Sequence, residues 1–101
     1  MTLEKWQKLS FFEQMGNIGS EVSRAGHWIE KGDKENQKKS LERARVLIDL
    51  SIQSQKGSPR LFELLRLREV ICDIFIGGRN YNVHPRNLEN YFLPFALAAR
   101  K

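Results

Sequence analysis

An apolar stripe in the first third of the sequence limits the fold more than any other feature. Apolar residues recur there at steps of four, three, four, three and four: Phe11, Met15, Ile18, Val22, Ala25 and Ile29. This spacing places them on one face of an α-helix. Ser10 and Glu13 form a capping-box pattern, in which each side chain satisfies the free backbone N–H of the other residue. The pattern predicts a helix over residues 11–31 that ends near Gly32.

Two more long helices are predicted, over residues 33–54 and 59–76. The inner face of the first is formed by Leu41, Ala44, Leu47, Ile48 and Ile52. Apolar residues of 59–76 cover more than one face, so we expect this helix to be the most buried one. Ser58 suits an N-cap and Pro59 a first helical position. Gly77 and Gly78 should end the helix.

A shorter helix should begin at Pro85. Leu88, Tyr91, Phe92 and Phe95 recur in it at helical spacing. Pro94 should kink or interrupt this helix, because proline removes a hydrogen bond and crowds the preceding turn. Before the first long helix, residues 2–8 should form a short turn that places Trp6 on the bundle.

Together these elements predict the fold class. The connections are short, and this favours antiparallel neighbours. No alternation typical of strands occurs. We therefore expect an all-α fold, an up-and-down bundle of three long helices plus a shorter fourth that Pro94 interrupts, with residues 1–101 as a single domain.

Composition places the chain among globular proteins, with 41% hydrophobic and 29% charged residues. No apolar run approaches the roughly 20 residues of a membrane-spanning helix. The first residues lack the basic and apolar segments of a signal peptide. The one cysteine, Cys72, lies in an apolar stretch and is interpreted as a small buried residue in a reducing compartment. We therefore expect a cytoplasmic protein without a membrane partner.

The net charge of +5 is compatible with nucleic-acid or acidic protein partners. The positive residues are spread along the chain, however, and the densest segment mixes both signs. Glu35 can pair with Lys39, and Arg45 with Asp49, at the i,i+4 spacing of a helix. This segment is interpreted as a solvated helix face.

Three glycines lie inside the first long helix: Gly16, Gly19 and Gly26. Each costs about 1 kcal/mol relative to alanine in a helix. Gly19 and Gly26 flank the apolar stripe, and with Ser20 and Ser23 they make a shallow groove that lets another helix approach closely. The groove either packs against another part of the same chain or forms an interface with a partner.

Metal and acid–base sites are not favoured. His27, His84 and Cys72 form no ligand cluster, and we expect neither a metal nor a cofactor. Glu69 and Asp73 lie one turn apart and could do acid–base work, but they are more typical of surface ion pairs with Arg66 and Arg68. The sequence contains no phosphate-binding loop and no hydrolase nucleophile motif.

Residues 79–84 read R-N-x-x-x-H. This resembles the signature of HEPN-type ribonucleases, small helical bundles in which Arg and His from two protomers meet and cut RNA without a metal. The resemblance implies that Arg79 binds phosphate, His84 moves a proton and Asn80 orients one of them. An Arg fork suits a phosphate, and a His with a near-neutral pKa suits proton transfer.

The same segment also suits a plain connector between two helices. Asn80 and Asn82 tolerate turn conformations. Arg79 could cap the preceding helix, Tyr81 could seal the end of the bundle, and His84 precedes Pro85 in the extended conformation that proline favours.

A wider resemblance runs from residue 6 to about residue 76. The phrases WQKLSFFEQMGNIGSEV, LERARVLIDLSI and RLREVICDIF are similar to a group of short, uncharacterised bacterial helical-bundle proteins. The resemblance implies a recurring domain and does not indicate an activity.

The sequence therefore favours a small non-enzymatic interaction or adaptor module, with a homodimer or another protein as partner. Its candidate contact residues are Gly16, Gly19, Gly26, Tyr91, Phe92 and Phe95. One alternative is a metal-independent ribonuclease that uses Arg79, Asn80 and His84. A second is a basic bundle that binds nucleic acid through Arg79, Tyr81, Arg86 and Arg100.

Overall fold

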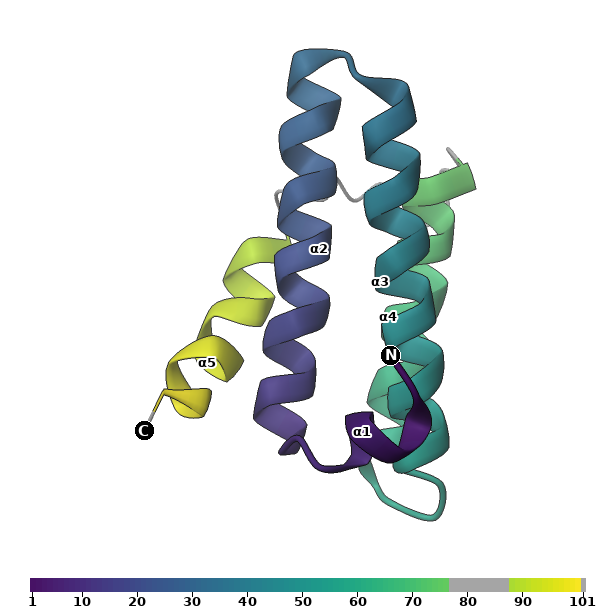
Figure 1. Cartoon of the computed structure of the whole chain (residues 1–101), viewed down its shortest axis with the longest axis vertical. Helices are drawn as coiled ribbons and strands as arrows, with labels where there is room; N and C mark the ends of the chain where they lie inside the picture. The colour runs from purple at the N-terminus through teal and green to yellow at the C-terminus, as the bar shows by residue number, and fades with distance from the viewer. Residues whose placement is uncertain (77–87, 101) are drawn as a thin grey trace.

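The computed structural model describes residues 1–76 and 88–100, and the side chains of residues 74–76 are not described. These residues form five helices: α1 (Leu3–Gln7), α2 (Phe11–Lys31), α3 (Lys34–Ser54), α4 (Arg60–Ile76) and α5 (Glu89–Ala99). Figure 1 shows α2, α3 and α4 running in alternating directions. No strand occurs in the described ranges, so the predicted all-α class is confirmed.

The ends of α2 lie at the residues that the sequence predicts. The Ser10 hydroxyl accepts a hydrogen bond from the Glu13 backbone N–H at 3.1 Å, and the Glu13 carboxylate accepts one from the Ser10 backbone N–H at 3.0 Å. The capping box is therefore complete. Gly32 ends the helix with a φ of 72°, a left-handed conformation that glycine adopts at little cost.

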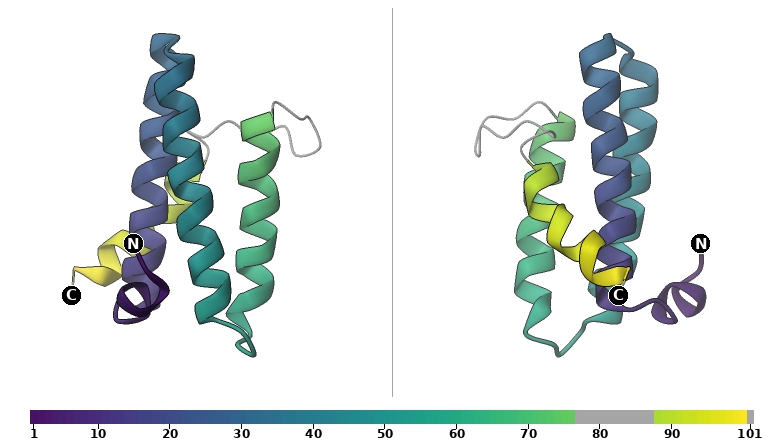
Figure 2. Two further views of the ribbon diagram at one scale, coloured as in Figure 1. Left: turned by 45° about the vertical axis from the view of Figure 1, so that its right-hand side comes forward. Right: turned by 90° about the vertical axis from the view of Figure 1, so that its left-hand side faces the viewer.

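The apolar stripe of α2 lies at the centre of the molecule, between α3 and α5. Met15, Ile18, Val22 and Ala25 are buried. Leu41, Ala44 and Ile48 of α3 and Leu64, Leu67 and Ile71 of α4 complete the core together with Trp6, Phe11 and Phe92. Figure 2 shows α4 beside α3 and α5 crossing α2 diagonally.

The most buried helix is α2, and the prediction that α4 would hold this place is wrong. Nine residues of α2 are buried. On α4, Leu64, Leu67 and Ile71 face the core, whereas Phe62 is 80% exposed. The physical reason is position, because α2 has helices on two sides and α4 packs mainly on α3. Some apolar side chains of α4, such as Phe62, are therefore not covered by neighbouring helices.

The short helix α1 lies against α3 and confirms the predicted position of Trp6. The indole of Trp6 is buried, and its N–H donates to the Ser51 hydroxyl of α3 at 2.9 Å. The Gln14 side-chain amide donates to the backbone carbonyl of Trp6 at 3.1 Å. Residues of α2 and α3 thus hydrogen-bond to polar groups of Trp6, and Ser51 satisfies the buried indole N–H.

The last helix, α5, continues through Pro94, so of the two predicted effects of this proline, a kink or an interruption, the interruption is wrong. Asn90 and Pro94 are both exposed. Water can therefore reach the carbonyl group that the missing proline N–H leaves free, and this lowers the cost of proline inside a helix. The predicted start at Pro85 and the stop at Gly77 and Gly78 lie outside the described residues.

Candidate functional site

Two of the three glycines of α2, Gly16 and Gly19, face α5 of the same chain. A Cβ atom added to Gly19 would lie 2.7 Å from both Cβ and Cγ of Phe92. At Gly16 the nearest atom would be Cα of Ala96, at 3.9 Å. Gly26 is buried. Packing within the chain, one of the two alternatives for this groove, therefore accounts for the glycine at position 19, whereas position 16 has room for a Cβ atom.

The aromatic residues of α5 also make contacts within the chain. Phe92 is buried against Gly19. The ring of Phe95 packs edge-on against that of Phe11, with centroids 5.9 Å apart. The Tyr91 hydroxyl donates a hydrogen bond to the Glu63 carboxylate of α4. Burial, and then the Glu63 carboxylate, raise the pKa of Tyr91.

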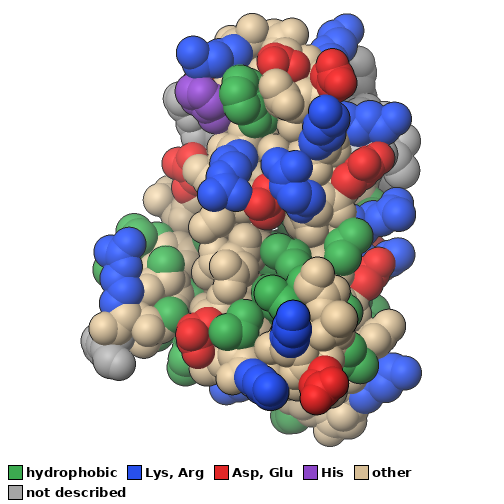
Figure 3. All heavy atoms as spheres, in the orientation of Figure 1, with side chains coloured by type: hydrophobic (Ala, Val, Ile, Leu, Met, Phe, Trp, Pro, Cys, Tyr) green, Lys and Arg blue, Asp and Glu red, His purple; other side chains and the backbone are tan. Residues whose placement is uncertain are grey.

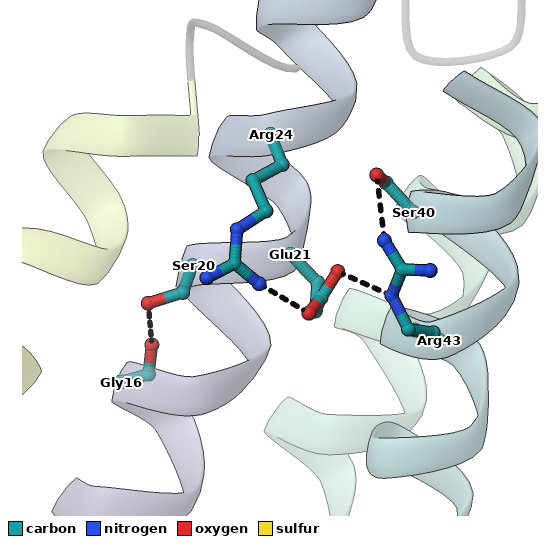
Figure 4. Close-up of polar contacts among 6 residues, drawn as sticks. All are labelled: Gly16, Ser20, Glu21, Arg24, Ser40 and Arg43. Atoms are coloured by element: carbon teal, nitrogen blue, oxygen red, sulfur yellow. Dashed lines mark hydrogen bonds and ion pairs between the residues drawn. The ribbon is translucent and has the colours of Figure 1, made fainter. Parts of the chain in front are cut away.

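A buried carboxylate joins α2 to α3 (Figure 4). Glu21 accepts from Nη1 of Arg24 at 2.6 Å and from Nε of Arg43 at 2.9 Å. Arg43 also donates from Nη2 to the Ser40 hydroxyl at 3.3 Å. Glu21 is 8% exposed, whereas the two arginine side chains are 60% and 54% exposed. One carboxylate between two guanidinium groups leaves one net positive charge at the surface.

Helix geometry explains how this cluster forms. Glu21 lies one turn after Ile18 and beside Val22, so it shares the apolar face of α2 that packs on α3. Arg24 lies three residues further along α2, and Ser40 lies three residues before Arg43 on α3. A carboxylate directly beside the apolar stripe was the available signal for this cluster, and the sequence analysis did not identify it.

An open groove of about 460 Å³ adjoins the cluster. It is lined by Met1, Glu21, Lys39, Glu42, Arg43, Val46 and Leu47. On the face drawn in Figure 3, Lys and Arg side chains lie above an area of hydrophobic side chains. The lining of the groove therefore combines two cations and two carboxylates with three apolar residues.

Apolar side chains are also exposed on α4 and α5. Phe62 and Leu65 lie about one turn apart on α4, and Leu93 and Leu97 lie one turn apart on α5. A smaller hollow of about 180 Å³ separates these two helices and is lined by Glu63, Arg66, Leu67, Val70, Leu88 and Tyr91. Exposed pairs on neighbouring helices are candidates for contact with a partner.

Most of the proposed catalytic and nucleic-acid residues lie outside the described ranges: Arg79, Asn80, Tyr81, His84 and Arg86. Arg100 is exposed at the end of α5.

The ion-pair partners and the burial of several polar residues can be compared with the sequence predictions. Asp49 pairs with Arg68 of α4 at 2.8 Å, and not with Arg45 of its own helix. The predicted pair of Glu35 and Lys39 is present at 3.4 Å. Asp73 is buried and not at the surface, and Cys72 is half-buried and not fully enclosed. Contacts between helices decide these environments, and spacing within one helix does not report them.

Within residues 1–76 and 88–100, no group of three or more His, Cys, Asp or Glu side chains is placed to hold a metal ion. None of the helices in these ranges is both long and apolar enough to cross a membrane. The fold therefore places the described chain among all-helical proteins. No protein-family model, curated protein or solved structure matches the chain.

Proposed function

We propose that this protein is a small non-enzymatic interaction module of the cytoplasm, an adaptor that binds a protein partner. Its helices would form an up-and-down bundle of three long helices and a shorter fourth. The observation that carries the proposal is Phe62, whose 80% exposure is unusual for a residue of this size. Leu65, 41% exposed, follows it about one turn along α4.

The outer face of α4 has the properties of a contact surface. Large aromatic side chains contribute most of the energy at many protein interfaces. Full burial of a Phe or Leu side chain contributes about 1.5–3 kcal/mol. The opposite face of α4 already packs on the core through Leu64 and Leu67, so the helix is held rigidly while its outer face stays open.

A second copy of the chain is the partner that we propose for this face. In a two-fold symmetric dimer the same patch meets itself, so an apolar stripe is complementary to its own copy. Phe62 would then pack against the partner's α4.

Self-association tests this proposal. We expect the wild-type chain to form dimers as its concentration rises in sedimentation-velocity runs. Phe62→Ser and Leu65→Ser should each shift the equilibrium about tenfold or more toward the monomer, because each removes apolar area from the interface. Val46→Ser is a matched control, because Val46 is also exposed but lies on α3.

A wild-type chain that stays monomeric at the highest soluble concentration would remove the homodimer from the proposal. Equal dimerisation of wild type and Phe62→Ser would remove α4 as the contact helix. The ribonuclease and nucleic-acid alternatives stay proposals, because their main residues lie outside the described ranges and no described residue favours them.

A further inference from the structure

The hollow between α4 and α5 is open to solvent and has a volume of about 180 Å³. Three aliphatic side chains and one aromatic ring line it together with two charged residues: Glu63, Arg66, Leu67, Val70, Leu88 and Tyr91. The Tyr91 hydroxyl donates to the Glu63 carboxylate, so a hydrogen bond links the two helices beside the hollow. An apolar surface of this kind gains free energy when another apolar group covers it.

The size of the hollow suits one aromatic ring. An apolar cavity of about 150 Å³ is large enough to hold one benzene molecule, and the hollow is slightly larger than this. Of the aromatic side chains in the described ranges, that of Phe62 is the most exposed, at 80%. Helix α4 therefore carries both a protruding ring and one wall of a hollow that such a ring would fill.

Helix geometry explains why the ring and the hollow meet between two copies and not within one. Phe62 is not among the residues that line the hollow of its own chain. With 3.6 residues per turn, it points about a quarter turn away from the side of α4 that carries Glu63, Arg66, Leu67 and Val70. A two-fold axis perpendicular to α4 reverses the direction of the second helix and exchanges its two sides. The protruding ring of each copy then lies against the hollow of the other.

The same symmetry defines the register of the two helices. Phe62 lies about one turn before the middle of the lining that α4 contributes. The two-fold axis must therefore cross α4 near Leu65, halfway between the ring and the hollow. In this register Arg66 of one copy lies at the level of the partner's Glu63, so side chains of opposite charge meet beside the buried ring.

We propose that the hollow between α4 and α5 binds the Phe62 ring of a second copy of the chain, so that two copies exchange identical contacts. The inference rests on the self-association proposed above and names the site that buries the exposed ring. It also adds α5 to the interface, because Leu88 and Tyr91 form one wall of the hollow.

Two complementary variants test the inference. Phe62→Ala removes the ring and keeps the hollow, whereas Val70→Phe fills the hollow and keeps the ring. Each should weaken the homodimer about tenfold or more in sedimentation-velocity runs, because the first loses apolar area and the second leaves no space for the partner's ring. A mixture of the two should form heterodimers about tenfold more readily than either forms homodimers. In the mixed dimer, the intact ring of one variant meets the intact hollow of the other.

The matched control is Val46→Phe, which makes the same change at an exposed position of α3 that does not line the hollow. It should leave dimerisation unchanged. Circular dichroism melts show whether Val70→Phe remains folded, and Leu88→Phe fills the hollow independently from the side of α5.

The outcomes separate this inference from the self-association on which it rests. If Phe62→Ala dissociates the dimer but the two filled variants dimerise like wild type, the hollow is not the binding site and α4 remains the contact helix. Absence of preferred heterodimers in the mixture would overturn the hollow in the same way. A wild-type chain that stays monomeric would overturn both proposals.

Discussion

Gly19 shows at the scale of one residue how the packing of α5 limits the sequence of α2. The glycine lies in the middle of a helix, where it is locally unfavourable. The ring and Cβ of Phe92 occupy the space that a side chain would need. Gly16 lies about one turn away on the same helix, and it has room for a Cβ. The two glycines therefore look alike in the sequence and differ in the structure.

Alanine substitution should separate the two positions. Gly16→Ala should raise the free energy of unfolding by about 0.5–1 kcal/mol, because alanine favours the helix and meets no close atom. Gly19→Ala should lower it by about 1–3 kcal/mol, because Phe92 must shift in a packed core. Urea denaturation of both variants and wild type measures the effect. Equal stabilisation by both changes would show that Phe92 does not pack on Gly19.

At the scale of elements, side-chain contacts link α5 to both of its neighbours. Phe92 packs on α2, Ser23 of α2 donates to the Glu89 carboxylate at 3.1 Å, and Tyr91 bonds to Glu63 of α4. The Tyr91 hydroxyl is the one of these groups whose pKa is raised by the fold. The link between α4 and α5 should therefore depend on pH in the alkaline range.

The sign of this dependence follows from the raised pKa. An unfolded chain releases the Tyr91 proton near pH 10, whereas the folded chain retains it to higher pH. The contribution to stability is complete below pH 10 and is lost as pH rises above it. Urea denaturation between pH 8.5 and 11 should show a steeper loss for wild type than for Tyr91→Phe. The difference should stay below about 1.4 kcal/mol per pH unit, the limit for one proton, and solvent reduces it further because the side chain is only half-buried. Parallel curves for the two proteins would contradict the assignment.

At the scale of the whole molecule, positive and negative side chains are interleaved. Described cations such as Arg24, Arg43 and Arg68 each lie against a carboxylate. The net charge of +5 is therefore distributed over the surface with many local pairs. Such a surface attracts nucleic acid weakly, and salt should screen that attraction strongly.

RNA cleavage is the sharpest test of the enzymatic alternative. We expect wild-type protein to leave single-stranded and structured RNA intact in the presence of a chelator. A ribonuclease of the HEPN type would instead cut RNA under these conditions, and His84→Ala would abolish the cutting. His27→Ala is the matched control, because it removes the other histidine of the chain. Cleavage that His84→Ala removes and His27→Ala retains would replace the adaptor proposal by the enzymatic one.

The sequence alone determined the helices and many of their ends. The spacing of Met15, Ile18 and Val22 predicts α2, and Ser10, Glu13 and Gly32 predict its limits, because capping and periodicity act within a few residues of the chain. The place of Trp6 on the bundle was predicted for a similar reason, since a large apolar ring near a helical core is buried.

Only the tertiary structure decided which faces are covered. The exposure of Phe62, the contact of Gly19 with Phe92 and the pairing of Asp49 with Arg68 each depend on which helices are neighbours. The Glu21 cluster arises in the same way, because Glu21 of α2 meets Arg43 of α3, which lies 22 residues further along the chain. Hydrophobic burial is non-directional and sets how much apolar surface must be covered, whereas the packing of neighbouring helices sets which residues remain open to a partner.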